Sequence, residues 1–138
     1  MSITSEPEVS VIVPTYREAE NLSALCAALD GVMQAGDIAY ELLIVDDQSP
    51  DETIRIATEL ADEYPLRLIQ PVGRDRDLSL SVLDGFEAAE SDKIVVMDAD
   101  LSHPVDVIPE LVRELDAGPG VLVAGSRYAP GGAFDRHW

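Results

Sequence analysis

The chain has almost no lysine. Lys93 is the only one among 138 residues, and lysine and arginine together number 9 against 27 aspartates and glutamates, a formal net charge of −18. Non-specific nucleic-acid binding needs basic surface to neutralise phosphates, so this charge balance argues against it. Two interpretations of the acidity remain: a surface that serves a basic partner, or adaptation to a salt-rich cytoplasm that screens charges within a few ångströms.

The scarcity of lysine favours the second interpretation, because a partner site would not require removing lysine along the whole chain. The composition resembles that of halophilic archaeal proteins. The scarcity of cysteine and of long apolar runs bears on the cellular compartment in which we expect the protein. Cys26 is the only cysteine, so the chain cannot form an internal disulfide, and no apolar run approaches the roughly 20 residues that span a bilayer. Residues 1–6 lack the features of a signal peptide, and we expect a cytoplasmic protein.

With 46% hydrophobic residues, the chain has enough apolar side chains for the core of one domain, which we expect to span residues 1–138. Strands are predicted at 9–13, 40–45, 66–69, 94–97 and 121–124, and helices at 21–34, 49–64, 78–89 and 104–115. Pro14 is expected to end the first strand, Ser49 to cap the second helix, and Cys26 to pack in the core. This alternation predicts an α/β fold with a mostly parallel central sheet flanked by helices.

Polar residues follow four of the predicted strands, at 15–18, 46–47, 98–100 and 126–127. Ligands of open parallel sheets bind beyond the carboxyl ends of the strands, so these four segments are expected to meet at one edge. The segments therefore hold the candidate functional residues.

Asp98 and Asp100 are alternate residues after an apolar strand, a spacing that can direct two carboxylates to one point. Such oxygen ligands suit Mg²⁺ or Mn²⁺. The plainer interpretation is that Asp100 caps the helix near Pro104. Arg127 could clamp a phosphate through paired hydrogen bonds, or be an ordinary surface arginine.

Asp46 and Asp47 end another strand, where either can serve as turn and capping residue for the next helix. Tyr16 and Glu18 could stack on and hydrogen-bond a nucleoside, or be loop residues without a ligand.

Four ordered motifs together resemble a known family. They are VIVPTYREAENL at 11–22, IVDDQSPD at 44–51, VMDADLSHP at 96–104, and GSRY at 125–128 followed by PGG at 130–132. They are similar to V-P-T-Y-N-E-x-x-N-L, V-D-D-x-S-x-D, M-D-A-D-L-Q-H-P and G-S-R-Y-x-x-G-G of the family-2 glycosyltransferases, in the dolichol-phosphate mannose or glucose synthase branch. The resemblance covers about residues 9 to 132.

The resemblance implies a Rossmann-like GT-A domain that binds a nucleotide-diphosphate sugar. The implied reaction is a metal-dependent, inverting transfer of a hexose from a GDP-mannose or UDP-glucose type donor to a polyprenol or dolichol phosphate. A lipid acceptor further implies peripheral association with the inner face of the membrane. The implied site residues are Pro14, Tyr16, Glu18 and Asp46 for the nucleoside with Asp47 nearby, Asp98 and Asp100 with Ala99 between them for Mg²⁺ or Mn²⁺, and Arg127 for phosphate.

The sequence departs from this pattern in three places. Ser102 stands where these synthases usually carry glutamine, and 73–81 replaces a more glycine-rich and basic stretch. The chain also ends at Trp138, where such synthases continue with acceptor-side elements, which leaves a catalytically inactive GT-A interaction module as the alternative. A receiver-type phosphoacceptor domain would also place acids after strands, but it needs a lysine after a later strand, and Lys93 is the only lysine.

The composition yields a first prediction. If the acidity is an adaptation to salt, the melting temperature will rise steeply between low and multimolar KCl, because added salt screens repulsion among the acidic groups. Circular dichroism melts across that range measure it. A melting temperature independent of KCl would contradict the interpretation.

Overall fold

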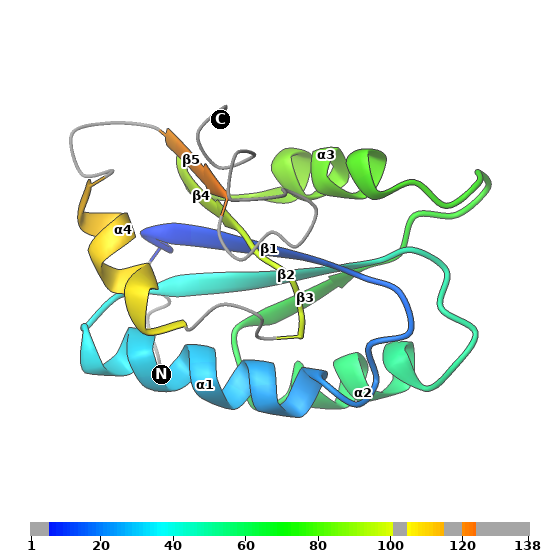
Figure 1. The fold of residues 1–138 in the computed structure, drawn as a ribbon, viewed down its shortest axis with the longest axis horizontal. Helices are drawn as coiled ribbons and strands as arrows, with labels where there is room; N and C mark the ends of the chain where they lie inside the picture. The colour runs from blue at the N-terminus through cyan, green and yellow to red at the C-terminus, as the bar shows by residue number, and fades with distance from the viewer. Residues whose placement is uncertain (1–5, 101–104, 115–119, 124–138) are drawn as a thin grey trace.

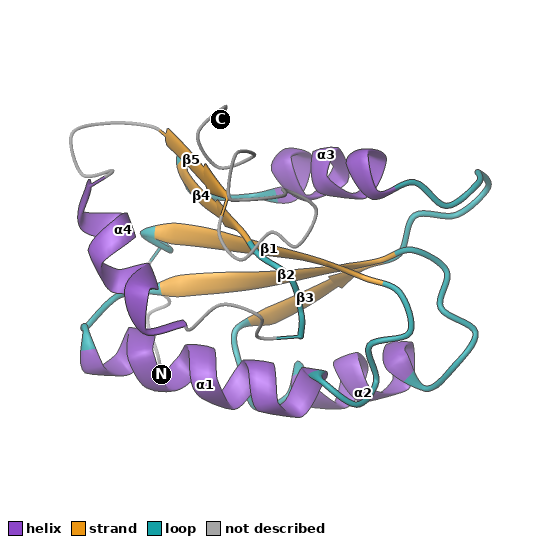
Figure 2. Ribbon diagram, viewed as in Figure 1, coloured by secondary structure: helices purple, strands orange, loops and turns teal. Residues whose placement is uncertain are grey.

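The computed structural model describes residues 6–100, 105–114 and 120–123. Within them lies a five-stranded, wholly parallel sheet of order β3-β2-β1-β4-β5 (Figure 1, Figure 2). The elements are β1 (Val9–Thr15), α1 (Leu22–Ala35), β2 (Tyr40–Asp46), α2 (Thr53–Leu60), β3 (Leu66–Ile69), α3 (Leu78–Ala88), β4 (Lys93–Val96), the 3₁₀ turn η1 (Val105–Val107), α4 (Ile108–Glu114) and β5 (Gly120–Val123). The predicted α/β class and parallel sheet are confirmed.

Helices cover both faces of the sheet. In Figure 1, α1, α2 and α4 lie on one face and α3 on the other. Because successive residues of a strand point to opposite faces, Val11 and Val13 of β1 join the larger core under α1, whereas Ile12 joins the smaller core under α3. The sheet is therefore buried on both sides, as parallel sheets require.

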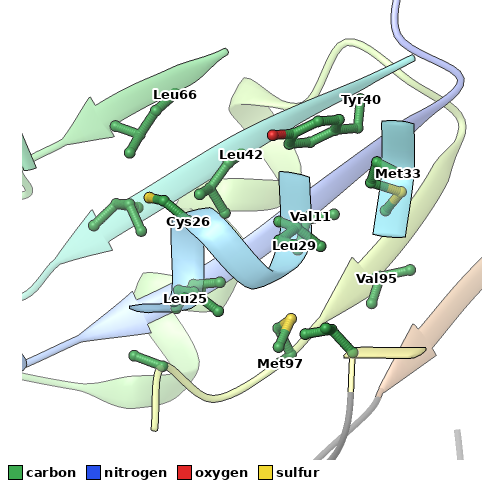
Figure 3. Close-up of a cluster of buried hydrophobic side chains, with 14 of the residues drawn as sticks. Val11, Leu25, Cys26, Leu29, Met33, Tyr40, Leu42, Leu66, Val95 and Met97 are labelled. Atoms are coloured by element: carbon green, nitrogen blue, oxygen red, sulfur yellow. The ribbon is translucent and has the colours of Figure 1, made fainter. Parts of the chain in front are cut away.

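The larger core is closed by the apolar stripe of α1 (Figure 3). Leu25, Leu29 and Met33 are fully buried there. Cys26 lies in the same core as predicted, and burial raises the pKa of its thiol to about 11. A thiol with that pKa is almost wholly protonated near neutral pH, so its contribution is to packing.

Pro14 does not end β1, contrary to prediction; the strand continues through Thr15. The ladder between β1 and β4 ends at Ile12↔Val96, followed by a bond from Met97 N to Ile12 O. Pro14 lies two residues after Ile12, so its backbone N faces β4, as the backbone of Ile12 does. It lies beyond the last residue pair of the β1–β4 ladder. The missing N–H of Pro14 therefore interrupts no sheet hydrogen bond.

The second helix is shorter than predicted at both ends, because α2 spans Thr53–Leu60 rather than 49–64. Ser49 does not cap it: the serine is engaged by Asp46 and by Arg17 N, while Asp51 Oδ1 accepts from Thr53 N. After Leu60 the backbone bonds tighten to the i→i+3 type at Asp62 and Glu63, which ends the α-helix.

The other boundaries lie within a few residues of prediction. The helix predicted at 104–115 consists of η1 and then α4, and β4 begins one residue earlier than predicted. Lys93 and Ile94 are partly exposed, so β4 is fully buried only at its carboxyl end.

The carboxyl end of α3 is fixed to the sheet by a buried Glu41. Its carboxylate accepts from Ser10 Oγ at 2.6 Å, from Glu90 N at 2.7 Å and from Arg67 Nη2 at 2.9 Å. Arg67 also donates to Ala88 O, in the last turn of α3. This network sets where α3 lies above the sheet.

Gly85 lets α3 approach β1 closely. A Cβ added there would lie 2.6 Å from Cγ2 and 3.0 Å from Cδ1 of Ile12. Ile12 is β-branched and fully buried, so it cannot rotate away without disturbing the smaller core. The spacing between helix and sheet therefore depends on a glycine at this position.

Gly85→Ala is expected to lower the free energy of unfolding by about 1–3 kcal/mol, the usual cost of overpacking. Gly31→Ala is the matched control, since a Cβ there meets no heavy atom within 4 Å. Gly31→Ala is expected to leave stability unchanged or raise it by up to about 1 kcal/mol through helix propensity. Denaturant unfolding in high KCl measures both, and equal stabilities would contradict the close approach.

Candidate functional site

The site is built around the buried carboxylate of Asp46 at the end of β2. Asp46 is 0% exposed. Its Oδ1 accepts from Thr15 Oγ1 and from Ser49 Oγ, both at 2.7 Å, and its Oδ2 accepts from Ser49 N at 2.9 Å. The three bonds join the end of β1 to the loop that follows β2.

Further bonds lock the two loops together. Arg17 N donates to Ser49 Oγ at 2.9 Å, Glu18 N to Thr53 Oγ1 at 3.1 Å, and Asp47 N to Thr15 O at 2.9 Å. The backbone is left-handed at Arg17, with φ of 58°, and at Gln48, with φ of 68°. Non-glycine residues rarely adopt this region, and such conformations persist only where the surroundings impose them.

A pocket of about 310 Å³ opens beside these loops. Its lining comes from the ends of β1 and β2 and from the start of α3. The loops that follow β1 and β2 and the loop that precedes α3 lie on the right of Figure 1. The lining residues are Pro14, Thr15, Tyr16, Glu18, Asp47, Arg76, Asp77, Leu78 and Ser81. Four residues predicted from the sequence, Pro14, Tyr16, Glu18 and Asp47, are therefore brought together, whereas Asp46 does not line the pocket.

Asp47 has one oxygen committed and one without a partner. Its side chain is 7% exposed, and Oδ2 accepts from Asp77 N at 2.6 Å. Oδ1 is buried and has no hydrogen-bond partner within the described part of the chain, and the same holds for Ser81 Oγ. Asp47 Oδ1 and Ser81 Oγ are therefore the two polar atoms of the pocket lining that a ligand or a water is expected to hydrogen-bond.

The loop between β3 and α3 supplies the side of the pocket that sequence reasoning missed. Arg76 Cζ lies 3.9 Å from the centroid of the Tyr16 ring, a cation–π distance. Gln48 Nε2 donates to Arg74 O at 2.7 Å, and Arg74 forms an ion pair with Asp84 at 2.7 Å. Asp77 caps α3 by accepting from Leu80 N. The sequence signal for this side of the pocket was Asp77, an aspartate directly before the predicted helix.

Asp98 and Asp100 follow β4, which neighbours β1 in the sheet. Both are partly buried, and Ala99 between them is buried. Within residues 6–100, 105–114 and 120–123, no group of three or more histidines, cysteines or acids could hold a metal. Because Mg²⁺ and Mn²⁺ are often bound by one or two carboxylates plus substrate phosphates, two aspartates form a fitting donor set. Arg127 and Ser102 lie outside the described residues.

Among the described residues, no helix has the length and apolarity needed to cross a bilayer.

The chain matches the family model described as glycosyl transferase family 2 over residues 10–138. It is 45% identical over 128 residues to a dolichol-phosphate mannosyltransferase of Pyrococcus furiosus, covering 93% of this chain and 35% of that protein. It is 39% identical to a dolichol-phosphate mannosyltransferase of Saccharomyces cerevisiae, covering 95% of this chain and 49% of the yeast protein. The chain thus spans about a third to a half of the length of the curated relatives it matches.

Solved structures agree. The mannosyltransferase PcManGT of Pyrobaculum calidifontis, in complex with GDP-Man and Mn²⁺, is 29% identical with a TM-score of 0.69, covering 86% of this chain and 35% of that one. TarS of S. aureus in complex with UDP-GlcNAc is 21% identical with a TM-score of 0.62, covering 80% of this chain and 31% of that one, a likeness of fold alone.

Proposed function

The chain belongs to glycosyl transferase family 2, and from that premise we propose that its pocket binds the nucleoside of a nucleotide-diphosphate sugar. The observation that carries the proposal is the buried Oδ1 of Asp47, which has no hydrogen-bond partner among the described residues, in a pocket whose lining also holds Tyr16 with the Arg76 guanidinium over its ring. A carboxylate oxygen only accepts hydrogen bonds, so it favours a ligand with an N–H or O–H donor, and a guanidinium stacked on an aromatic ring offers a flat surface to a planar ligand. A nucleobase has both features.

The charges in the pocket favour a base over a phosphate at this position. Glu18, Asp47 and Asp77 bring three carboxylates, and Arg76 is the only cationic side chain among the lining residues. An anion would be repelled there unless a cation came with it. The diphosphate of the donor is therefore assigned to the edge next to β4.

Asp98 and Asp100 would hold a divalent cation at that edge. Bound there, the cation would supply Lewis-acid stabilisation to the departing nucleoside diphosphate. Arg127 is proposed to contact a phosphate of donor or acceptor, by its match to the family motif alone. Ala99, which is buried, would space the two aspartates.

The proposed reaction is the inverting transfer of a hexose to a polyprenol phosphate presented at a membrane surface. The names of the curated relatives support this acceptor, and a bound GDP-Man in PcManGT supports GDP-mannose over UDP-glucose as donor. A phosphate acceptor is already ionised near neutral pH and needs little help from a general base. The proposal thus assigns no side chain to that role.

Calorimetric titration in high KCl tests the proposal, with GDP-mannose, UDP-glucose, GDP and UDP, each with and without Mn²⁺. The expected result is Mn²⁺-dependent binding of the guanine nucleotides that weakens about tenfold or more in Asp98→Asn and Asp100→Asn, because each loses a charged metal ligand. Asp47→Asn is expected to weaken GDP by a similar factor with or without Mn²⁺, since the lost bond is to the base.

Asp62→Asn, an exposed carboxylate on the surface after α2, is the charge-matched control and is expected to bind as the wild type does. A folded wild-type chain that binds none of the four ligands would contradict the proposal. The alternative of an inactive interaction module would then be preferred.

A further inference from the structure

Ser81 carries a buried hydroxyl to which the described part of the fold offers no hydrogen-bond partner. Its side chain is 0% exposed, and Oγ forms no hydrogen bond with any residue in the described ranges. A buried hydroxyl without a partner costs about 1–3 kcal/mol relative to a paired one, so such a group is expected to meet a ligand or a water. Ser81 is also one of the residues lining the pocket.

Neither helix geometry nor packing explains a serine at this position. Serines inside helices commonly bond back to the carbonyl four residues earlier, but that carbonyl, Asp77 O, accepts from the Ser81 backbone N at 3.0 Å and not from Oγ. The neighbouring residues of α3 that pack on the sheet are apolar, among them Val82 and Phe86. Alanine would remove this hydroxyl at the loss of only one packed oxygen atom.

The second unpartnered atom of the pocket lining, Asp47 Oδ1, indicates what the hydroxyl meets. The carboxylate oxygen accepts from an N–H or O–H of the ligand, and the hydroxyl can donate to a carbonyl oxygen next to that donor. Guanine presents this pair as N1–H beside O6, and uracil presents it as N3–H beside O4. A phosphate would bring a negative charge against Asp47 and Asp77, so a neutral edge fits better.

We propose that Ser81 is a specificity-determining residue of the pocket, whose hydroxyl donates a hydrogen bond to the carbonyl oxygen of the base while Asp47 accepts from the adjacent N–H. The inference rests on the proposed function, because it takes the ligand to be a nucleotide. It adds a contact from α3, in the stretch where the sequence departs from the family pattern.

The test is the affinity of Ser81→Ala for GDP and for guanosine, measured by calorimetry in high KCl. Both ligands are expected to bind about three- to tenfold more weakly than to the wild type, by the same factor, because both carry the base. Ser79→Ala is the matched control, an exposed serine of the same helix turn, and is expected to bind both ligands within about twofold of the wild type.

A second readout separates a ligand contact from a structural role. Without ligand, Ser81→Ala is expected to melt at the same temperature as the wild type or higher, because it removes a buried hydroxyl without a partner in the described ranges. Weaker ligand binding together with undiminished stability supports the contact. A loss of stability that accounts for the weaker binding would overturn it.

The remaining outcomes are also decisive. Unchanged affinity of Ser81→Ala for guanosine overturns the inference, and weakening confined to GDP overturns it in favour of a phosphate contact. If the wild type binds UDP rather than GDP, the UDP and uridine pair gives the same comparison. A folded wild type that binds neither diphosphate contradicts the proposed function itself, which a failure limited to Ser81→Ala does not.

Discussion

The site depends on one buried carboxylate. Asp46 accepts three hydrogen bonds from Thr15 and Ser49, and thereby fixes the end of β1 against the loop after β2. Ser49 in turn receives Arg17 N, so the turn after β1 is held in a left-handed conformation that the chain would not adopt alone. Asp47, the next residue, thereby has one oxygen on the residue before α3, while its other oxygen has no hydrogen-bond partner among the described residues. The two adjacent aspartates thus differ in role: Asp46 holds the loops together, and Asp47 lines the pocket.

The distribution of acids also bears on how a strongly anionic chain can bind an anionic donor. A net charge of −18 opposes the approach of a nucleoside diphosphate at low salt. In the proposed arrangement the pocket acids Glu18, Asp47 and Asp77 lie near the uncharged base. Asp98 and Asp100 would bind a cation that contacts the diphosphate. High salt and the metal then act in the same direction, because each reduces the repulsion between protein and donor.

Sequence periodicity predicted the order and type of the elements, because parallel strands buried on both faces and amphipathic helices leave strong local patterns. It also predicted that Tyr16, Glu18 and Asp47 would meet, since parallel strands end at one edge, whereas Pro14 was a site residue only by the resemblance to the family. It could not separate Asp46 from Asp47, because the difference lies in bonds to Thr15 and Asp77, each about 30 residues away. The prediction that Ser49 caps α2 was wrong for the same reason, because the fold, and not the local sequence, brings Ser49 to its partners Asp46 and Arg17. Ser81 left no sequence signal, since a serine inside a helix reads as an ordinary polar residue.

Amide hydrogen exchange of Asp46→Asn in high KCl, compared with Asp62→Asn, tests this account most directly. An asparagine places an N–H₂ where one carboxylate oxygen now accepts, so at least one of the three bonds is lost. The account predicts that the amides of Arg17, Glu18 and Asp47 exchange faster in Asp46→Asn than the fall in global stability, about 1–3 kcal/mol, can explain, while central β1 amides follow that fall alone. If those three amides keep their wild-type protection in a folded Asp46→Asn chain, the loops are positioned by other means and the central role of Asp46 is contradicted.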